Sequence, residues 1–223
     1  TKAFQDLIGP FLWQAGGTIY DEAGFHLDTP EMVEALTFFQ FFFKEGLAPA
    51  PGASQEGLSS TQLFIRGDIP MLISGPWTIG ELKKQGGEQF SEQWSVALMP
   101  KNKARTSFVG GGDLVVFKQS QNPDLAWAFI DYMTHPEVQA KWYSLTGDLP
   151  SVQAAWDLSP LAGDAKLQVF RQQLEDAKGP PPLPHWEEVN AKCGEIQEKV
   201  AANQLTPEQA AQQMQQVAES VKQ

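Results

Sequence analysis

Tryptophans and stretches of bare main chain are the features of this sequence that best fit a ligand-binding site. Three of the seven tryptophans lie near the ends of expected elements: Trp13, Trp77 and Trp186. A second segment joins three glycines to an acid: Gly110, Gly111, Gly112 and Asp113. Glycines expose main-chain N–H groups, and a sugar needs an aromatic face for its C–H groups and hydrogen-bond partners for its hydroxyls. These residue types therefore predict a carbohydrate site.

The free energy of such stacking is large enough to support binding. A sugar ring that covers about 60 Å² of an indole gains roughly 1.5 kcal/mol at about 25 cal/mol per Å². Two or three such contacts would supply roughly half of the ~8 kcal/mol that a micromolar complex represents. Main-chain groups and acids such as Asp113 would supply the rest.

The segment from Gly67 to Trp77 is expected to position one of these indoles. Apolar residues run from Ile69 to Ile73, and Gly75 and Pro76 follow them. An apolar run bounded by glycine and proline predicts a short buried strand that ends at the proline. Trp77 would then lie at the carboxyl edge of a strand, where ligands bind in open α/β sheets. A single tryptophan more often has a core or boundary role, so this prediction depends on the other aromatic residues around it.

The sequence gives little support for a metal site, a reactive thiol or a phosphate-binding loop. The histidines at 26, 135 and 185 have no carboxylate or cysteine at ligand spacing. The single cysteine, Cys193, excludes an internal disulfide and a multi-cysteine zinc site, and we expect it to be buried on a helix. The glycine run lacks the spacing of a phosphate loop. We therefore expect no metal, no cofactor and no catalytic residue.

The charge and the apolar runs limit the partners. The formal charge of -11 opposes binding to nucleic-acid phosphates. No apolar run approaches the ~20 residues of a membrane span. The first residues, Thr1 to Phe4, have neither the basic nor the apolar region of a signal peptide. We expect the chain to be mature, trimmed or cytosolic.

Helix starts and apolar spacing predict a mainly helical chain with short strands. Capping residues next to proline mark starts near Thr29, Asn122, Thr134 and Thr206. The expected helices reach or cover 4–15, 30–45, 60–66, 78–85, 123–133, 135–146, 158–177, 186–202 and 206–221. The expected strands cover 69–73, 94–99 and 114–117, with a hairpin-like turn at 21–24 and a polar loop at 48–60. In the helix at 30–45, Phe39 and Phe43 recur at helical spacing with Val33 and Leu36 and are expected in the core.

Two other functions remain open from the residues alone. The neighbouring acids Glu187 and Glu188 are a candidate carboxylate pair for a glycoside-active enzyme, although adjacent acids on a helix are normally a solvated face. The segment Gly179 to Pro184 is expected to be extended. It could be a polyproline II ligand for another protein, although a rigid connector is the commoner role.

Five segments in a fixed order resemble a known family. They are MLISGPW, VALMPKN, FVGGGDLVVFKQSQNPDLAWAFIDYMTHPEVQAKWYSLTGDLPS, PPPLPHWEEV and NQLTPEQAAQQMQQVA. Together they resemble the extracellular solute-binding proteins of carbohydrate ABC importers, of the maltose/trehalose-binding type. The resemblance implies an α/β fold like that of type II periplasmic binding proteins, with a mixed sheet flanked by helices. It also implies two lobes and a ligand cleft that closes like a hinge.

The resemblance assigns roles to the residues singled out above. Trp77 matches an aromatic residue that stacks on a sugar ring, and Gly110 to Asp113 match a segment that crosses between lobes and lines the cleft. Trp186 matches an aromatic position that faces the sugar in maltodextrin-binding relatives. Trp13 lies near the start of the family's second lobe.

Members of this family are nearly twice as long, so most of the first, N-terminal lobe is expected to be missing here. By analogy, residues 1–107 and 156–223 form the second, C-terminal lobe, and 108–155 belong to the first. We expect a fragment, or one piece of a split protein that adjoins its missing N-terminal half or a partner chain. Residues 108–155 should then expose an unusually apolar face or have it covered by another chain.

The function expected from the resemblance is non-catalytic binding of a di- or oligosaccharide. The sugar would be delivered to the membrane permease subunits of an ABC importer, at the periplasmic or extracellular face of the membrane, where a lipid anchor is also expected. Glycerol phosphate diesters are ligands of some relatives. The acidic charge weighs mildly against an anionic ligand.

Overall fold

The computed structural model describes residues 4–49 and 58–221, so residues 50–57 of the expected polar loop lie outside the described part. The described residues form two compact units. Unit 1 comprises those within Thr1–Gln55, Met99–Gly110 and Gln173–Gln223, and unit 2 comprises those within Glu56–Leu98 and Gly111–Gln172. The two lobes that the resemblance implies are parts of a complete protein, so their boundaries in this chain remain a prediction.

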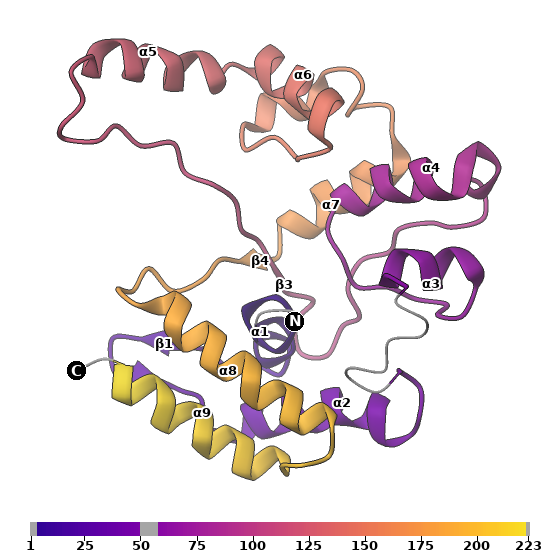
Figure 1. Cartoon of the computed structure of the whole chain (residues 1–223), viewed down its shortest axis with the longest axis vertical. Coiled ribbons are helices and arrows are strands. Elements are labelled where there is room, and N and C mark those ends of the chain that lie inside the picture. Colours follow the sequence, from indigo (N-terminus) through magenta and orange to yellow (C-terminus); the bar gives the residue numbers. More distant parts are fainter. Residues whose placement is uncertain (1–3, 50–57, 222–223) are drawn as a thin grey trace. The chain divides into compact units, whose positions relative to one another are not determined.

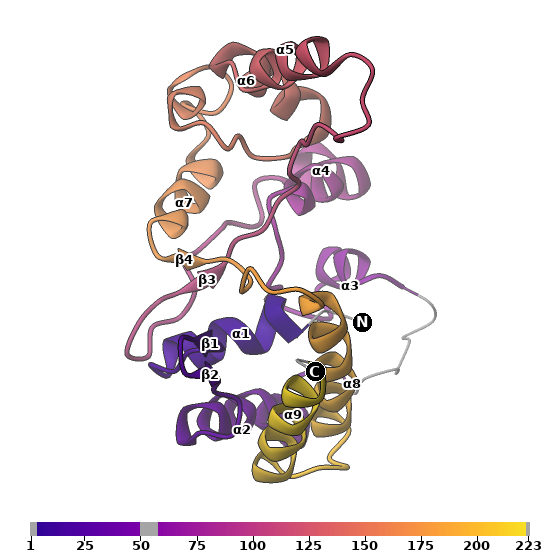
Figure 2. The same cartoon turned by 90° about the vertical axis from the view of Figure 1, so that its left-hand side faces the viewer.

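Unit 1 is built around four helices that enclose one apolar core. They are α1 (Phe4–Gln14), α2 (Pro30–Lys44), α8 (Trp186–Ala201) and α9 (Pro207–Val221). Figures 1 and 2 both show α8 and α9 side by side, and α2 packs against both. Fully buried side chains from all four helices meet in the core, among them Leu12, Leu36, Val200 and Met214. Burial of these apolar faces stabilises the helices more than their intrinsic propensity does.

Polar side chains fix where the helices of unit 1 begin. The Oγ1 atom of Thr29 accepts a hydrogen bond from the N–H of Met32 at 3.3 Å, and Pro30 occupies the first turn of α2. At the start of α9, Thr206 and Gln209 form a reciprocal capping box with distances of 3.1 and 3.2 Å. Both helix starts predicted from the sequence are confirmed.

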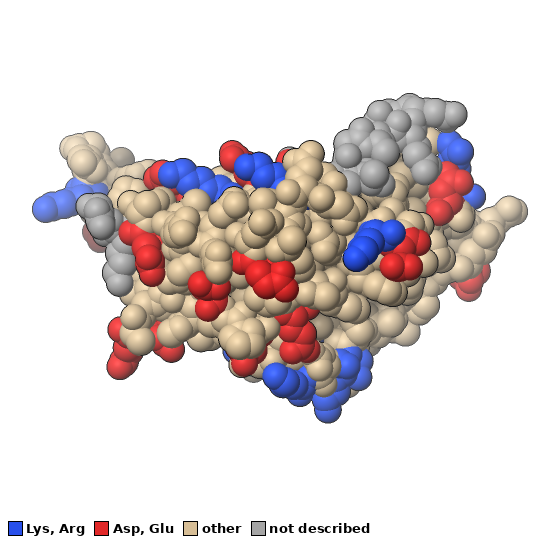
Figure 3. All heavy atoms as spheres, turned by 90° about the horizontal axis from the view of Figure 1, so that it is seen from below, with Lys and Arg blue, Asp and Glu red and all other residues tan. Residues whose placement is uncertain are grey.

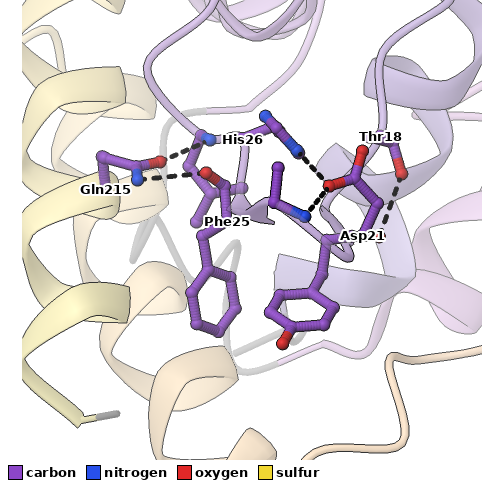
Figure 4. A network of polar contacts seen from close by, with 8 residues as sticks. Thr18, Asp21, Phe25, His26 and Gln215 are labelled. Atoms are coloured by element: carbon purple, nitrogen blue, oxygen red, sulfur yellow. Dashed lines mark hydrogen bonds and ion pairs between the residues drawn. The ribbon is translucent and has the colours of Figure 1, made fainter. Parts of the chain in front are cut away.

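A short hairpin confirms the predicted turn at 21–24 and is attached to α9. Strands β1 (Tyr20–Asp21) and β2 (Gly24–Phe25) pair antiparallel. The Asp21 carboxylate accepts from the Ala23 N–H at 2.8 Å and lies 2.7 Å from Nε2 of His26 (Figure 4). Gln215 of α9 accepts from the Leu27 N–H at 2.7 Å and donates to the Phe25 carbonyl at 3.1 Å. The Gln215 amide therefore anchors the hairpin to the core helices.

A second, parallel pairing joins two distant segments of unit 1. Strand β3 (Ser107–Phe108) lies beside β4 (Ala177–Lys178). The Thr106 hydroxyl donates to Asp176 at 2.6 Å, and the Gln14 side chain donates to the Thr106 carbonyl at 2.8 Å. These bonds attach the end of α1 to both strands. The pairing lies outside every expected strand.

Unit 2 has helices around a much smaller core. They are α3 (Ser60–Arg66), α4 (Trp77–Phe90), α5 (Pro123–Met133), α6 (Pro136–Thr146), the 3-10 turn η1 (Gln153–Asp157) and most of α7 (Ala165–Leu174). Its buried cluster consists of Ile79, Ala140, Trp156, Leu161 and Leu167. The predicted helix at 158–177 is shorter in the structure, because the Asp164 carboxylate accepts from the N–H groups of residues 166 and 167 and starts α7 there.

None of the three strands that were expected in unit 2 or at its boundary with unit 1 is formed. Residues 69–73, 94–99 and 114–117 carry no strand, and Met71, which was expected to be buried, is 80% exposed. A strand depends on a partner elsewhere in the chain, which local apolar patterns do not specify. The phenylalanine prediction for α2 is confirmed, because Phe39 is buried and Phe43 packs against the core of unit 1, whereas their neighbours Phe38 and Phe41 are exposed. Among residues 4–49 and 58–221, no helix is both long and apolar enough to cross a membrane.

Candidate functional site

The indole of Trp77 is exposed at the start of α4 and lies against Gly75. More than half of the residue, 54%, is accessible. A β-carbon built on Gly75 would fall 2.1 Å from Cζ3 and 2.2 Å from Cη2 of the Trp77 ring. Atoms cannot approach so closely, so only glycine allows the ring to take this position. Trp77 thus rests on bare main chain and leaves aromatic surface open to solvent.

The turn beneath Trp77 is held by short polar contacts and buried neighbours. The hydroxyls of Ser74 and Thr78 lie 2.7 Å apart, and the N–H of Thr78 donates to the Gly75 carbonyl at 3.1 Å. Thr78 and Ile79 are buried. The start of α4 is therefore anchored while its first side chain remains accessible, which is the arrangement that a stacking platform requires.

The glycine segment is exposed and its main chain is open. Each residue from Gly110 to Asp113 is exposed, and a β-carbon at Gly111 or Gly112 would meet no atom within 4 Å. The N–H of Val109 still donates to the Lys178 carbonyl at 3.0 Å, which is where the pairing with the β4 strand ends. Gly110 is the last residue of its stretch of unit 1, and Gly111 begins a stretch of unit 2. These residues therefore offer free N–H groups where the chain passes between units.

The structure places the other two candidate tryptophans in the core of unit 1. Trp13 and Trp186 are each only 5% exposed. Nε1 of Trp186 donates to Oε1 of Gln5 at 2.6 Å, and a β-carbon at Gly9 would lie 3.6 Å from the Trp13 ring. Packing covers most of both aromatic faces, whereas the indole of Trp77 is open to solvent. A ligand-binding role for either one stays a prediction.

The proline-rich segment is bent and lines a shallow hollow. The N–H of Leu183 donates to the Pro181 carbonyl at 2.8 Å, which is a three-residue turn, so the prediction of a fully extended segment was wrong. His185 then adopts a left-handed conformation with φ of 60° just before α8. The hollow, of about 550 Å³, is lined by residues 181–187. A straight polyproline II ligand would lack both the turn and the left-handed residue.

The candidate catalytic pair, Glu187 and Glu188, does not have the surroundings of a glycosidase acid. Glu188 accepts from Lys192 at 2.7 Å, and this hydrogen bond lowers the pKa of the Glu188 carboxyl. A glycosidase acid needs a raised pKa.

Burial raises the pKa of the Cys193 thiol to about 12, so it is not a nucleophile. In the part of the chain that the structure describes, no group of three His, Cys, Asp or Glu residues could hold a metal ion.

Comparison with known structures defines the fold. The sugar-binding protein MalE of Xanthomonas citri superimposes with a TM-score of 0.86 at 28% identity, over 97% of this chain and 55% of that one. The fold is therefore part of a type II periplasmic binding protein, mostly helical with small sheets. Residues 3–168 match the model of the bacterial extracellular solute-binding proteins, and the chain belongs to this family.

Two curated relatives show the range of the family's ligands. The galactooligosaccharide-binding protein of Bacillus subtilis is 22% identical over 87% of this chain and 46% of its own length. The sn-glycerol-3-phosphate-binding periplasmic protein UgpB of Escherichia coli K12 is 25% identical over 90% of this chain and 48% of its own length. The chain thus spans about half the length of these relatives.

Proposed function

We propose that this chain is part of a non-catalytic binding protein that captures a di- or oligosaccharide for an ABC importer. The observation that carries the proposal is the exposed indole of Trp77, which is seated on Gly75 at an anchored helix start. A flat aromatic surface held in this way suits the C–H face of a pyranose. The names of the relatives MalE and galactooligosaccharide-binding protein support the same ligand class.

In the proposed binding mode, an aromatic ring contacts the sugar face and main-chain groups bind the sugar hydroxyls. Trp77 covers one sugar face, which contributes about 1.5 kcal/mol for roughly 60 Å² of contact. The N–H groups of Gly110 to Gly112 donate to sugar hydroxyls, and the Asp113 carboxylate accepts from another hydroxyl. Trp13 and Trp186 would have to move out of the core to join them. No bond is broken, and the sugar leaves unchanged for the permease subunits.

The place of this chain in the complete protein is part of the proposal. Residues 1–107 and 156–223 would belong to the C-terminal lobe and 108–155 to the N-terminal lobe, with the cleft closing on the sugar. The protein would work on the periplasmic or extracellular side of the membrane, held there by a lipid anchor.

Charge favours a neutral sugar over an anionic ligand. The formal charge is -11, and acidic side chains are scattered over the face drawn in Figure 3. Such a field repels phosphates unless local cations oppose it. The glycerol phosphate ligand in the name of UgpB is therefore the less favoured class for this chain.

The proposal is tested by a thermal-shift screen of the complete protein against maltose, trehalose, longer glucans and sn-glycerol 3-phosphate. We expect a rise in the melting temperature with at least one neutral sugar, together with a saturable change in tryptophan fluorescence. Chromatography of the sugar after prolonged incubation should recover it intact. A response to glycerol phosphate alone, or turnover of the sugar, would contradict the proposal.

A further inference from the structure

A turn at the end of α6 lies against the first residue of α4. A β-carbon built on Gly147 would fall 3.9 Å from the Cα atom of Trp77. Consecutive Cα atoms are about 3.8 Å apart, so the Cα atoms of Asp148 and Trp77 are at most about 9 Å apart. Both residues belong to unit 2. The backbone of Asp148 is therefore close to the indole that we assign to sugar stacking.

Hydrogen bonds and apolar packing fix this turn. Gly147 is left-handed, with φ of 82°, and its N–H donates to the Tyr143 carbonyl at 2.8 Å, which ends α6. The Asp148 N–H donates to Oγ1 of Thr146 at 3.1 Å. Tyr143 and Leu149, on either side of the turn, pack against the buried cluster that also contains a residue from the first turn of α4. The turn and the start of α4 are therefore held in one arrangement.

The Asp148 carboxylate takes no part in holding the turn. Asp148 is exposed, and within residues 4–49 and 58–221 its carboxylate has neither a hydrogen-bond partner nor an ion pair. The Thr146 hydroxyl fixes the backbone here instead. A negative charge just after a helix C-terminus is also unfavourable, because the carbonyl end of a helix carries partial negative charge. Stability thus gives no reason for an acid at this position, and residues of that kind are expected at functional sites.

Residues 108–155 expose an unusually apolar surface, as predicted. It includes Leu125, Trp127 and, close to the turn, Leu145. Apolar and aromatic side chains contact the C–H face of many sugars but do not distinguish their hydroxyls. A carboxylate does distinguish them, because it only accepts hydrogen bonds and therefore selects donors at fixed positions. A sugar site in this part of unit 2 thus needs a polar group such as Asp148 for its selectivity.

We propose that Asp148 is a specificity-determining residue beside Trp77, where its carboxylate accepts hydrogen bonds from hydroxyl groups of the bound sugar. Its two oxygens can accept from two neighbouring hydroxyls of one pyranose. Such charge-assisted hydrogen bonds are stronger than neutral ones. A ligand with a phosphate in place of those hydroxyls meets a like charge and leaves the carboxylate unpaired, so it is rejected. The inference rests on the proposed function, because it names the group that selects the ligand at that site.

Titration of the complete protein with maltose, trehalose, maltotetraose and sn-glycerol 3-phosphate tests this proposal. Asp148→Ala should bind the neutral sugar at least about 10-fold more weakly than wild type, because the substitution removes a charge-assisted hydrogen bond. Asp148→Asn keeps the shape of the side chain and removes its charge. The preference of this second variant for the neutral sugar over sn-glycerol 3-phosphate should fall by about 5-fold or more.

Glu92→Ala is the matched control. Glu92 is exposed and follows the C-cap of α4, as Asp148 follows that of α6, but it lies at the opposite end of α4 from Trp77. The substitution removes the same charge at a comparable position. It should change the affinity for each ligand by less than about 2-fold, because distant exposed charges are largely screened.

The melting temperature without ligand separates recognition from a structural role. Because the Asp148 carboxylate has no partner, Asp148→Ala should shift this temperature by less than about 2 °C, and a larger fall would contradict the proposal. Equal sugar affinities of Asp148→Ala and Glu92→Ala would overturn the inference and leave the proposed function intact. If wild type binds none of the three sugars, the proposed function itself fails and the inference falls with it.

Discussion

The Trp77 ring lies so close to Gly75 that a β-carbon at residue 75 would fall 2.1 Å from Cζ3 of the indole. The glycine therefore has a steric role, because its lack of a side chain sets the position of the aromatic surface. The backbone of Gly75 does not need a left-handed conformation. The contact with the ring is thus the reason for a glycine at this position, and it makes the platform open to a direct test.

Gly75→Ala should weaken sugar binding without unfolding the protein. The methyl group would push the exposed ring off its seat, and loss of one stacking contact of roughly 1.5 kcal/mol corresponds to about 10-fold in affinity. Titration followed by tryptophan fluorescence measures the effect. Gly80→Ala in the same helix is the matched control, because a β-carbon there would meet no atom within 4 Å. Unchanged affinity in the Gly75 variant would show that the seat is not needed.

Thr29→Ala should destabilise unit 1 through the start of α2. The Oγ1 atom of Thr29 is the cap that accepts from Met32, and loss of such a cap costs about 1 kcal/mol. The melting temperature should fall by roughly 2–4 °C. Asp28→Ala is the control, since Asp28 is exposed and does not cap the helix, and should change stability by less than about 0.5 kcal/mol. The reverse order would place the cap at residue 28.

Asp21→Asn should alter how stability depends on acid pH. The hydrogen bond with His26 and that from Ala23 lower the pKa of the Asp21 carboxyl below its ordinary value of 3.8. A lowered folded-state pKa stabilises the protein above the ordinary value, and this contribution disappears as the pH falls through the lowered pKa. Thermal melts should therefore show that wild type and variant differ near pH 5 and converge toward pH 2. A difference that grows on acidification would contradict the assignment.

Cys193 should resist thiol reagents in the folded protein. It is fully buried, and burial raises its pKa to about 12. Its thiolate fraction at pH 8 is then about a thousand-fold below that of an ordinary cysteine, and access is blocked as well. Colour formation with a disulfide reagent should be complete in denaturant and negligible without it. Rapid reaction under native conditions would mean that α8 opens readily.

Local sequence signals predicted the helices well. Proline next to Thr29 and the box of Thr206 with Gln209 gave the starts of α2 and α9, because capping depends on neighbours within one turn. The hairpin at 21–24 followed from its turn residues. Helix ends within the run 158–177 were missed, since Asp164 starts α7 after a separate 3-10 turn at 153–157.

Local sequence signals could not predict the strands or which of the candidate site residues are buried. The apolar run at 114–117 has strand composition, but strand formation needs a partner that the described chain does not offer it. Trp13, Trp77 and Trp186 were all candidates in the sequence, with Trp77 the best supported, and tertiary packing buries the other two. The sequence predicted only that Gly75 and Pro76 end a strand, and it did not reveal that Gly75 makes room for the neighbouring indole.

The central claim, reversible sugar binding on the Trp77 platform, is tested most directly by isothermal titration of the complete protein and its Trp77→Ala variant with the best sugar from the screen. Phe41→Ala removes an exposed aromatic ring elsewhere and serves as the control. The account predicts saturable binding by wild type and control, with affinity at least about 10-fold weaker for the Trp77 variant. Equal affinity of the Trp77 variant and wild type would contradict it.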